Sequence, residues 1–164
     1  MKALLITAAL LAAAPLAAES PHEHAPEQAE VIAAADAFFF ALGSTRKTDL
    51  AEVMLPGGMI FIHDRRTPDA PRVDMVPVAQ HLERWARTTG RFVENMRYET
   101  VLVDGDMAQV WGPYVFFANS EVSHCGVNSL SMVRTESGWK VANTSFTMEP
   151  PGECKRLGAP GFDQ

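Results

Sequence analysis

The stretch that decides the fold is Met107–Met148, MAQVWGPYVFFANSEVSHCGVNSLSMVRTESGWKVANTSFTM. It contains three runs rich in β-branched and aromatic residues, separated by two short polar connections, Asn119–Glu121 and Glu136–Gly138. Connections this short join neighbouring antiparallel strands, and Gly138 can adopt the positive φ that a three-residue loop favours. The stretch therefore predicts three consecutive antiparallel strands.

The residues before this stretch add another strand. Phe92–Val103 is strand-like but long for a single strand, so we expect a bend near Glu94 or Asn95. An Asp-Gly turn at Asp104–Asp106 connects it to the next run, which makes Phe92–Phe117 an antiparallel hairpin. Together these runs predict a four-stranded antiparallel meander.

The register across the last turn decides which side chains lie opposite one another. A three-residue loop at Gly138 places Val133 opposite Val141 and Asn128 opposite Phe146. Both faces of the third strand of the meander, which carries His124 and Cys125, have apolar residues, whereas a sheet covered by helices on one face alternates more cleanly. A second copy of the chain is the simplest cover for the other face, and this predicts a homodimer through the sheet.

Three helices are expected before the meander. The first runs from Gln28 to a stop at Gly43, the second is Thr48–Met54, and the third begins at Pro77 and stops at Gly90. Each has apolar residues at spacings of three and four, which is typical of a helix with one buried face.

A small hairpin is expected between the second and third helices. Met59–His63 is short, apolar and preceded by glycines, as a buried strand is, and Val73–Val76 is its return strand. The predicted fold class is α+β, with three N-terminal helices packed on a long, curved antiparallel meander sheet.

The N-terminus has the parts of a secretory signal peptide. Lys2 precedes a short apolar run, and Ala17 and Ala18 are small residues suited to cleavage. The run is too short for a membrane span, which needs about 20 apolar residues. An uncleaved N-terminal helix is the alternative. We expect a periplasmic or secreted protein without a membrane span, with a signal peptide at 1–18, a flexible lead-in at 19–27, one domain at 28–149 and a C-terminal tail at 150–164.

The two cysteines, Cys125 and Cys154, are an even pair in a chain expected to reach an oxidising compartment. They predict a disulfide from the sheet to the tail, a cross-link worth about 3–4 kcal/mol if it acts through chain entropy. The alternative is a buried, unbonded Cys125 and a free thiol in the tail.

Length, composition and charge indicate the size of the domain and the classes of partner that it can bind. A chain of 164 residues with 47% hydrophobic residues can form one domain with a substantial core. The formal net charge is -6, and Lys and Arg are scattered rather than clustered. Nucleic-acid binding needs clustered cations that displace counterions from phosphates, so we expect no nucleic-acid partner.

Several motifs carry a family resemblance. The order of helices followed by a long meander ending in Gly138–Val141 resembles the nuclear transport factor 2-like superfamily, which includes ketosteroid isomerase-like proteins. Within it, Ala108–Tyr114, His124–Asn128 and Thr147–Pro150 leading to Cys154 are similar to an exported bacterial group described as lumazine-binding.

The resemblance covers roughly residues 28–154 and is tightest over Val110–Asn128. It implies a cone-shaped α+β fold with a pocket between helices and sheet, often dimeric. The chain departs from the pattern at Leu130, where phenylalanine is common, and in a lengthened loop at Arg65–Pro71.

Candidate site residues are the polar and aromatic groups that such a pocket could gather. A histidine can act as a base near neutral pH, a carboxylate can do so when desolvation raises its pKa, and Tyr or Asn can stabilise an oxyanion. We expect His124 and Glu94 to be catalytic if the protein is an enzyme. The expected ligand contacts are Tyr114, Trp111, His124, Asn128 and Phe146.

Structural explanations of these residues remain open. His124 could satisfy buried backbone groups, Glu94 could pair with Arg91 or Arg97, and Tyr114 and Trp111 could be core or interface aromatics. Two functions therefore stand: an exported module that binds a small, partly apolar ligand, and a cofactor-free isomerase, dehydratase or cyclase acting on a small apolar carbonyl compound. We expect no cofactor. We also expect no metal, because the histidines lack the i,i+4 or CxxC spacing of a metal site.

Overall fold

The computed structural model describes residues 25–162, and its first element is α1, Pro26–Gly43. The expected signal peptide lies outside the described residues. α1 begins two residues before the predicted Gln28, because Pro26 suits the first helical turn and the Gln28 side chain accepts a hydrogen bond from the Ala25 N–H at 3.1 Å. Gln28 Nε2 also donates to the Val101 carbonyl at 2.8 Å, which fastens this end of α1 to the sheet.

The described residues form one sheet of seven strands in the order β2-β1-β7-β6-β5-β3, with β4 also paired to β5. The strands are β1 Met59–Asp64, β2 Arg72–Pro77, β3 Phe92–Met96, β4 Thr100–Asp104, β5 Met107–Ala118, β6 Glu121–Thr135 and β7 Gly138–Met148. The predicted meander and the small hairpin are both present. The sheet is mixed rather than antiparallel throughout, because β1 pairs with β7 in parallel.

The predicted single strand Phe92–Val103 is two strands, β3 and β4, which both pair with β5. The break lies at Arg97–Glu99 rather than near Glu94. A Cβ added to Gly112 would lie 1.8 Å from the Arg97 carbonyl oxygen, so glycine lets the bent backbone cross β5 closely. The Arg97 and Glu99 N–H groups remain bonded to the Pro113 and Trp111 carbonyls.

The predicted register between β6 and β7 is right at one end and off by one at the other. Asn128 lies opposite Phe146 as expected, but Val133 pairs with Lys140 instead of Val141. Ala142 is an extra residue in β7, because Ser131 pairs with Asn143 while Met132 pairs with Val141.

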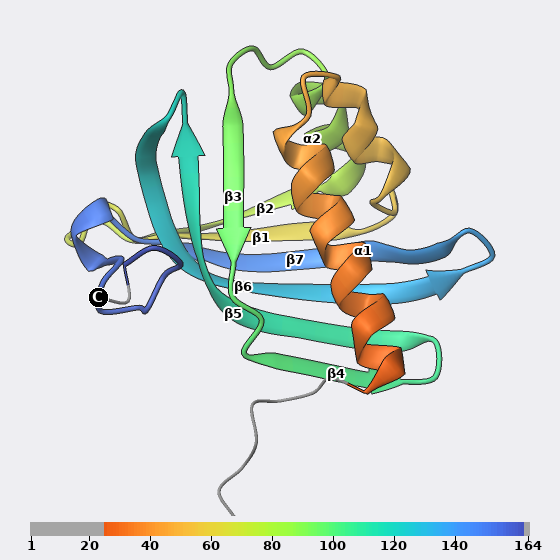
Figure 1. Cartoon of the computed structure of the whole chain (residues 1–164). Helices are drawn as coiled ribbons and strands as arrows, with labels where there is room; N and C mark the ends of the chain where they lie inside the picture. The colour runs from red at the N-terminus through yellow and green to blue at the C-terminus, as the bar shows by residue number, and fades with distance from the viewer. Residues whose placement is uncertain (1–24, 163–164) are drawn as a thin grey trace, which may run out of the picture.

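The three predicted helices are two α-helices and a 3₁₀ helix. α1 is the long one, η1 (Lys47–Glu52) replaces the predicted second helix, and α2 (Val78–Trp85) follows β2. η1 tightens to i→i+3 bonding, as in the Asp49 N–H to Arg46 carbonyl bond at 2.9 Å. Figure 1 shows α1 lying across one face of the curved sheet, with η1 and α2 beside its C-terminal end.

The main core lies between α1 and the inner face of the sheet. Its fully buried members include Val31 and Ala35 of α1 and Val110, Leu130 and Val141 of the sheet. The predicted alternation along β6 therefore directs Leu130 and His124 to the helix-covered face. This arrangement confirms an α+β layout with a helix packed on one face of the sheet.

A second, smaller core holds the C-terminal tail. Val115, Cys125, Cys154 and Ala159 are fully buried in it. The predicted disulfide is present, with Cys125 and Cys154 Cα atoms 5.5 Å apart, and it joins β6 to the residue that follows the 3₁₀ helix η2, Pro151–Glu153. Cys125 lies on the opposite side of β6 from His124, as the alternation predicts.

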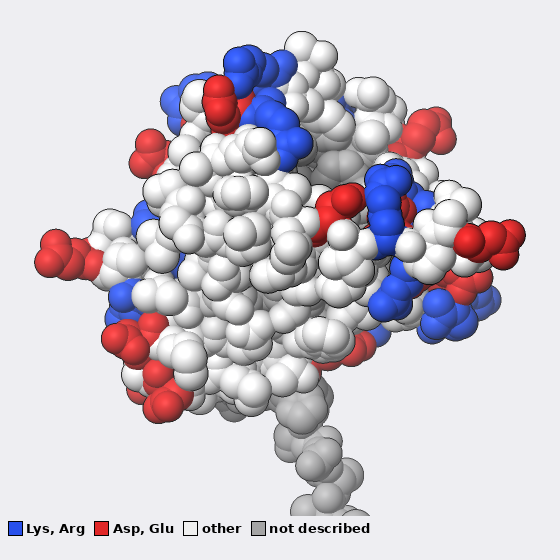
Figure 2. All heavy atoms as spheres, turned by 180° about the vertical axis from the view of Figure 1, so that it is seen from behind, with Lys and Arg blue, Asp and Glu red and all other residues white. Residues whose placement is uncertain are grey.

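The outer face of the sheet carries exposed apolar side chains and few charges. Figure 2 shows a broad uncharged area over this face, with most Lys, Arg, Asp and Glu near its margins. The large exposed apolar residues of the strands are Val73, Met75, Val93, Leu102, Met107, Trp111 and Val133. Within residues 25–162, no helix is both long and apolar enough to cross a membrane.

Candidate functional site

A cavity of about 160 Å³ lies between the helices and the inner face of the sheet. Its volume resembles that of an engineered cavity of about 150 Å³ that binds benzene, so it suits a ring of that size. The apolar wall is rich in rings and comprises Phe38, Leu42, Met54, Ile60, Ile62, Trp85, Phe116, Phe146 and Met148. The residues with polar groups are His81, Glu94, Tyr114, His124, Asn128 and Thr144.

Glu94 is the acidic residue of the cavity wall. It lies on β3, and its Oε1 accepts a hydrogen bond from Asn128 Nδ2 at 3.0 Å. Burial raises the pKa of Glu94 to about 8, and the Asn128 bond opposes this only in part. The carboxyl group is therefore mostly protonated at neutral pH and can donate a hydrogen bond. Its side-chain partner is Asn128 rather than either predicted arginine, and Arg97 binds Glu99 at 2.7 Å.

His124 is held as a neutral ring against other rings. Its ring centroid lies 4.9 Å from that of Phe116 and 5.8 Å from that of Tyr114. Nδ1 is 3.0 Å from the Ser123 hydroxyl, so this side chain, rather than a buried backbone group, is its partner. Burial, helped by the charge of Arg66, lowers the pKa of His124 to about 4. At neutral pH the His124 ring can donate or accept a hydrogen bond but carries no charge.

Tyr114 uses its hydroxyl to connect strands. The O–H donates to the Thr147 carbonyl at 2.7 Å, and burial raises its pKa. Gly126 allows this contact, because a Cβ there would lie 1.9 Å from the same carbonyl oxygen. The Tyr114 ring therefore lines the cavity, while its hydroxyl proton is already used in the hydrogen bond to the Thr147 carbonyl.

The structure brings most of the predicted site residues together. Glu94, Tyr114, His124, Asn128 and Phe146 all line the cavity. Trp111 does not: it is 48% exposed and pairs with Ser129 in the sheet, so it lies away from this cavity on the outer face.

The sequence predictions left out the helical part of the wall. Trp85 of α2 and Phe38 of α1 line the cavity, and Trp85 stacks on His81 with ring centroids 5.6 Å apart. Both occupy apolar positions of predicted helices. Helical periodicity could therefore place them in a core, but it could not distinguish a core from a cavity wall.

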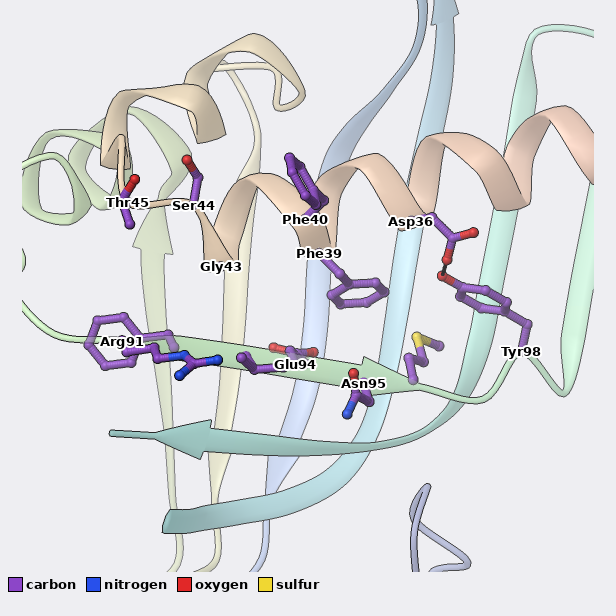
Figure 3. Close-up of a pocket in the computed structure, with 13 residues that line it drawn as sticks. Asp36, Phe39, Phe40, Gly43, Ser44, Thr45, Arg91, Glu94, Asn95 and Tyr98 are labelled. Carbon is purple, nitrogen blue, oxygen red and sulfur yellow. Dashed lines mark hydrogen bonds between the residues drawn. The ribbon is translucent and has the colours of Figure 1, made fainter. Parts of the chain in front are cut away.

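A second hollow of about 600 Å³ opens to the surface between α1 and β3. Figure 3 shows Phe39 of α1 pointing toward β3, on which Glu94 lies. At one end of this groove the Tyr98 hydroxyl donates to the Asp36 carboxylate at 2.5 Å. Glu94 lines both the groove and the cavity, which explains why the residue keeps some exposure although its carboxyl group is enclosed.

Comparison with known proteins identifies the fold. No family model and no curated protein sequence matches the chain. A candidate calcium/calmodulin-dependent protein kinase II association domain from Xanthomonas campestris is 21% identical with a TM-score of 0.58, over 74% of this chain and 87% of that one. A candidate dehydratase of the NTF2-like family from Streptomyces avermitilis is 18% identical with a TM-score of 0.58, over 74% and 95%.

An NTF2-like protein of unknown function from Shewanella baltica is 11% identical with a TM-score of 0.55, over 76% of this chain and 94% of that chain. These similarities confirm the nuclear transport factor 2-like fold that the sequence motifs suggested. At such low sequence identities these similarities show the fold and do not show an activity. The narrower resemblance to the lumazine-binding group stays a prediction.

Proposed function

We propose that this protein, once exported, binds a small and largely apolar molecule in the cavity between the helices and the sheet. The observation that carries this proposal is the Glu94 carboxyl group, held by Asn128 in a cavity whose wall is otherwise mostly apolar. Pockets of this kind gain affinity from the apolar wall and orientation from a few polar groups. The cavity volume of about 160 Å³ limits the part of the ligand inside it to about one ring.

The proposed polar contacts are Glu94 and His124. At neutral pH Glu94 presents an O–H donor, and the neutral His124 ring can donate or accept through Nε2 according to its tautomer. A ligand hydroxyl or carbonyl oxygen would meet both groups inside the cavity. Tyr114 and Phe146, whose ring centroids are 6.2 Å apart, contribute an apolar surface rather than hydrogen bonds.

Binding is tested by native mass spectrometry of the protein purified from the periplasm and by calorimetric titration with phenol and toluene. We expect phenol to bind more tightly than toluene, because only phenol can bond to Glu94 or His124. Glu94→Gln keeps a neutral donor and should retain phenol binding, whereas Glu94→Leu should remove most of the preference for phenol. Glu121→Gln changes an exposed carboxylate and is the matched control. If neither phenol nor toluene binds, the proposal is contradicted.

A second candidate function is acid/base catalysis, and the pKa of about 8 at Glu94 favours it. A carboxyl group with that pKa exchanges protons readily near neutral pH, as isomerisation, dehydration or cyclisation of a carbonyl compound requires. His124, whose pKa is about 4, suits hydrogen bonding better than proton abstraction.

Glu94→Gln separates the two functions. An enzyme should lose turnover while it still binds the ring compound, because Gln keeps the shape and a donor but cannot exchange the proton. A binding module should show no turnover in the wild-type protein when small cyclic enones and hydroxyketones are offered as substrates. Turnover that survives Glu94→Gln would exclude Glu94 as the acid or base.

A further inference from the structure

The cavity and the surface groove share a single lining residue among those described, Glu94. The cavity lies between the helices and the inner face of the sheet. The groove lies between α1 and the β3 strand, as Figure 3 shows. A molecule that occupies both hollows must therefore pass beside the Glu94 carboxyl group.

The charges of the two hollows differ. No Lys or Arg of residues 25–162 lines the cavity, and burial lowers the pKa of both His81 and His124. The groove contains Arg91, whose guanidinium makes no ion pair or hydrogen bond with any described residue. An anion in the cavity would lack a counter-charge, whereas an anion in the groove would find one.

The other charged groups near the groove are either paired or buried. Asp36 accepts the bond from Tyr98 at the far end, and Asp49 accepts bonds from Arg46 and Ser44, both at 2.7 Å. The Lys47 ammonium has no hydrogen-bond partner, but it is buried over the Phe92 ring, 4.9 Å from the ring centroid, and does not line the groove. Among the described residues that line the groove, Arg91 is thus the available cation.

We propose that the groove is a second subsite that binds a carboxylate, so that the ligand is an aryl or alicyclic monocarboxylate with its ring in the cavity and its carboxylate on Arg91. Guanidinium recognises carboxylate through paired N–H donors, which gives the subsite its chemical selectivity. Thr45 and Asn95 add hydroxyl and amide groups to the same groove. The protonated Glu94 between the subsites does not repel the anion. This inference rests on the proposed ring-binding function of the cavity.

The test compares 4-phenylbutyrate with 4-phenylbutanol, which differ in the head group and share the ring and chain. Calorimetric titration of the wild-type protein should give at least tenfold tighter binding of the carboxylate. Arg91→Gln should abolish that preference and leave 4-phenylbutanol and phenol unchanged, which also shows that the variant is folded. Arg87→Gln, which changes an exposed arginine of the loop after α2, should have no effect on any probe.

The outcomes separate the subsite from the cavity function. Equal affinity for the two head groups, or an equal loss of both in Arg91→Gln, would overturn the carboxylate subsite while phenol binding upheld the cavity. Failure of phenol, alcohol and carboxylate alike would overturn the cavity function and the subsite with it.

Discussion

Glu94 and His124 titrate in opposite directions from their ordinary values, although they line one cavity. The pKa of Glu94 rises to about 8 and that of His124 falls to about 4, in both cases mainly because burial disfavours the charged form. At neutral pH the cavity is therefore uncharged, and its polar groups act as hydrogen-bonding groups. The same shifts couple folding stability to pH.

The pH dependence of stability follows from the protons bound in each state. Between pH 4.5 and 8 native Glu94 holds a proton that the unfolded chain has released, so it makes stability fall as pH rises. Between pH 4 and 6.5 unfolded His124 binds a proton that the native ring lacks, so it makes stability rise with pH. His81 acts in the same direction as His124. The effects oppose each other below pH 6.5, and of these three groups only Glu94 acts above it.

We predict that the free energy of unfolding falls between pH 6.5 and 8 with a slope of up to about 1.4 kcal/mol per pH unit. In Glu94→Gln this slope should disappear, and the rise between pH 4 and 6.5 should become visible. Urea denaturation at half-unit pH intervals measures both. Glu121→Gln should follow the wild-type curve, and a wild-type curve that is flat between pH 6.5 and 8 would contradict a buried, protonated Glu94.

At the scale of elements, glycines determine how closely the strands approach. Gly126 lets the Thr147 carbonyl reach Tyr114, and Gly58 leaves room for the Ala142 carbonyl at the β7 bulge, where a Cβ would lie 1.6 Å away. In both cases the atom in the way belongs to the backbone and cannot rotate aside. These contacts hold β7 in the register that brings Phe146 opposite Asn128 in the cavity wall.

Gly126→Ala should therefore lower the free energy of unfolding by about 2–3 kcal/mol, because the added methyl group forces β6 and β7 apart. It should also weaken phenol binding, since the strands that separate form the cavity wall. Urea denaturation and calorimetry measure the two effects. Gly152→Ala is the matched control, because a Cβ at Gly152 would meet no atom within 4 Å. A neutral Gly126→Ala would show that the sheet relaxes easily there.

At the scale of the whole molecule, the outer face of the sheet is the surface suited to self-association. Leu102 of β4 and Met107 and Trp111 of β5 are 62%, 61% and 48% exposed, and they form one apolar patch with Val133. The side of the molecule seen in Figure 2 has a broad uncharged area, with most charged residues near its margins. We therefore keep the predicted homodimer through the sheet as a proposal, because an exposed apolar patch of this kind marks an interaction surface.

We expect the wild-type protein to sediment as a dimer in analytical ultracentrifugation. Trp111→Lys should raise the dissociation constant of the dimer at least tenfold, because the lysine ammonium would have to be buried in the interface. Phe40→Lys is the control, since Phe40 is 81% exposed on α1 and lies away from this face. A monomeric wild-type protein at high concentration would contradict the proposal.

The amino-acid sequence alone determined the strands other than the break between β3 and β4, the turns, the disulfide and the shared side of β6 that carries His124 and Asn128. These features depend on alternation along one strand, on turn residues and on the pairing of two cysteines, so neighbouring residues are enough to predict them. The tertiary structure alone decided that Glu94 meets Asn128 rather than an arginine, that Trp111 faces outward, that Ala142 bulges and that β1 runs parallel to β7. Each of these depends on segments far apart in the chain, because burial and close backbone approach arise only when such segments pack together.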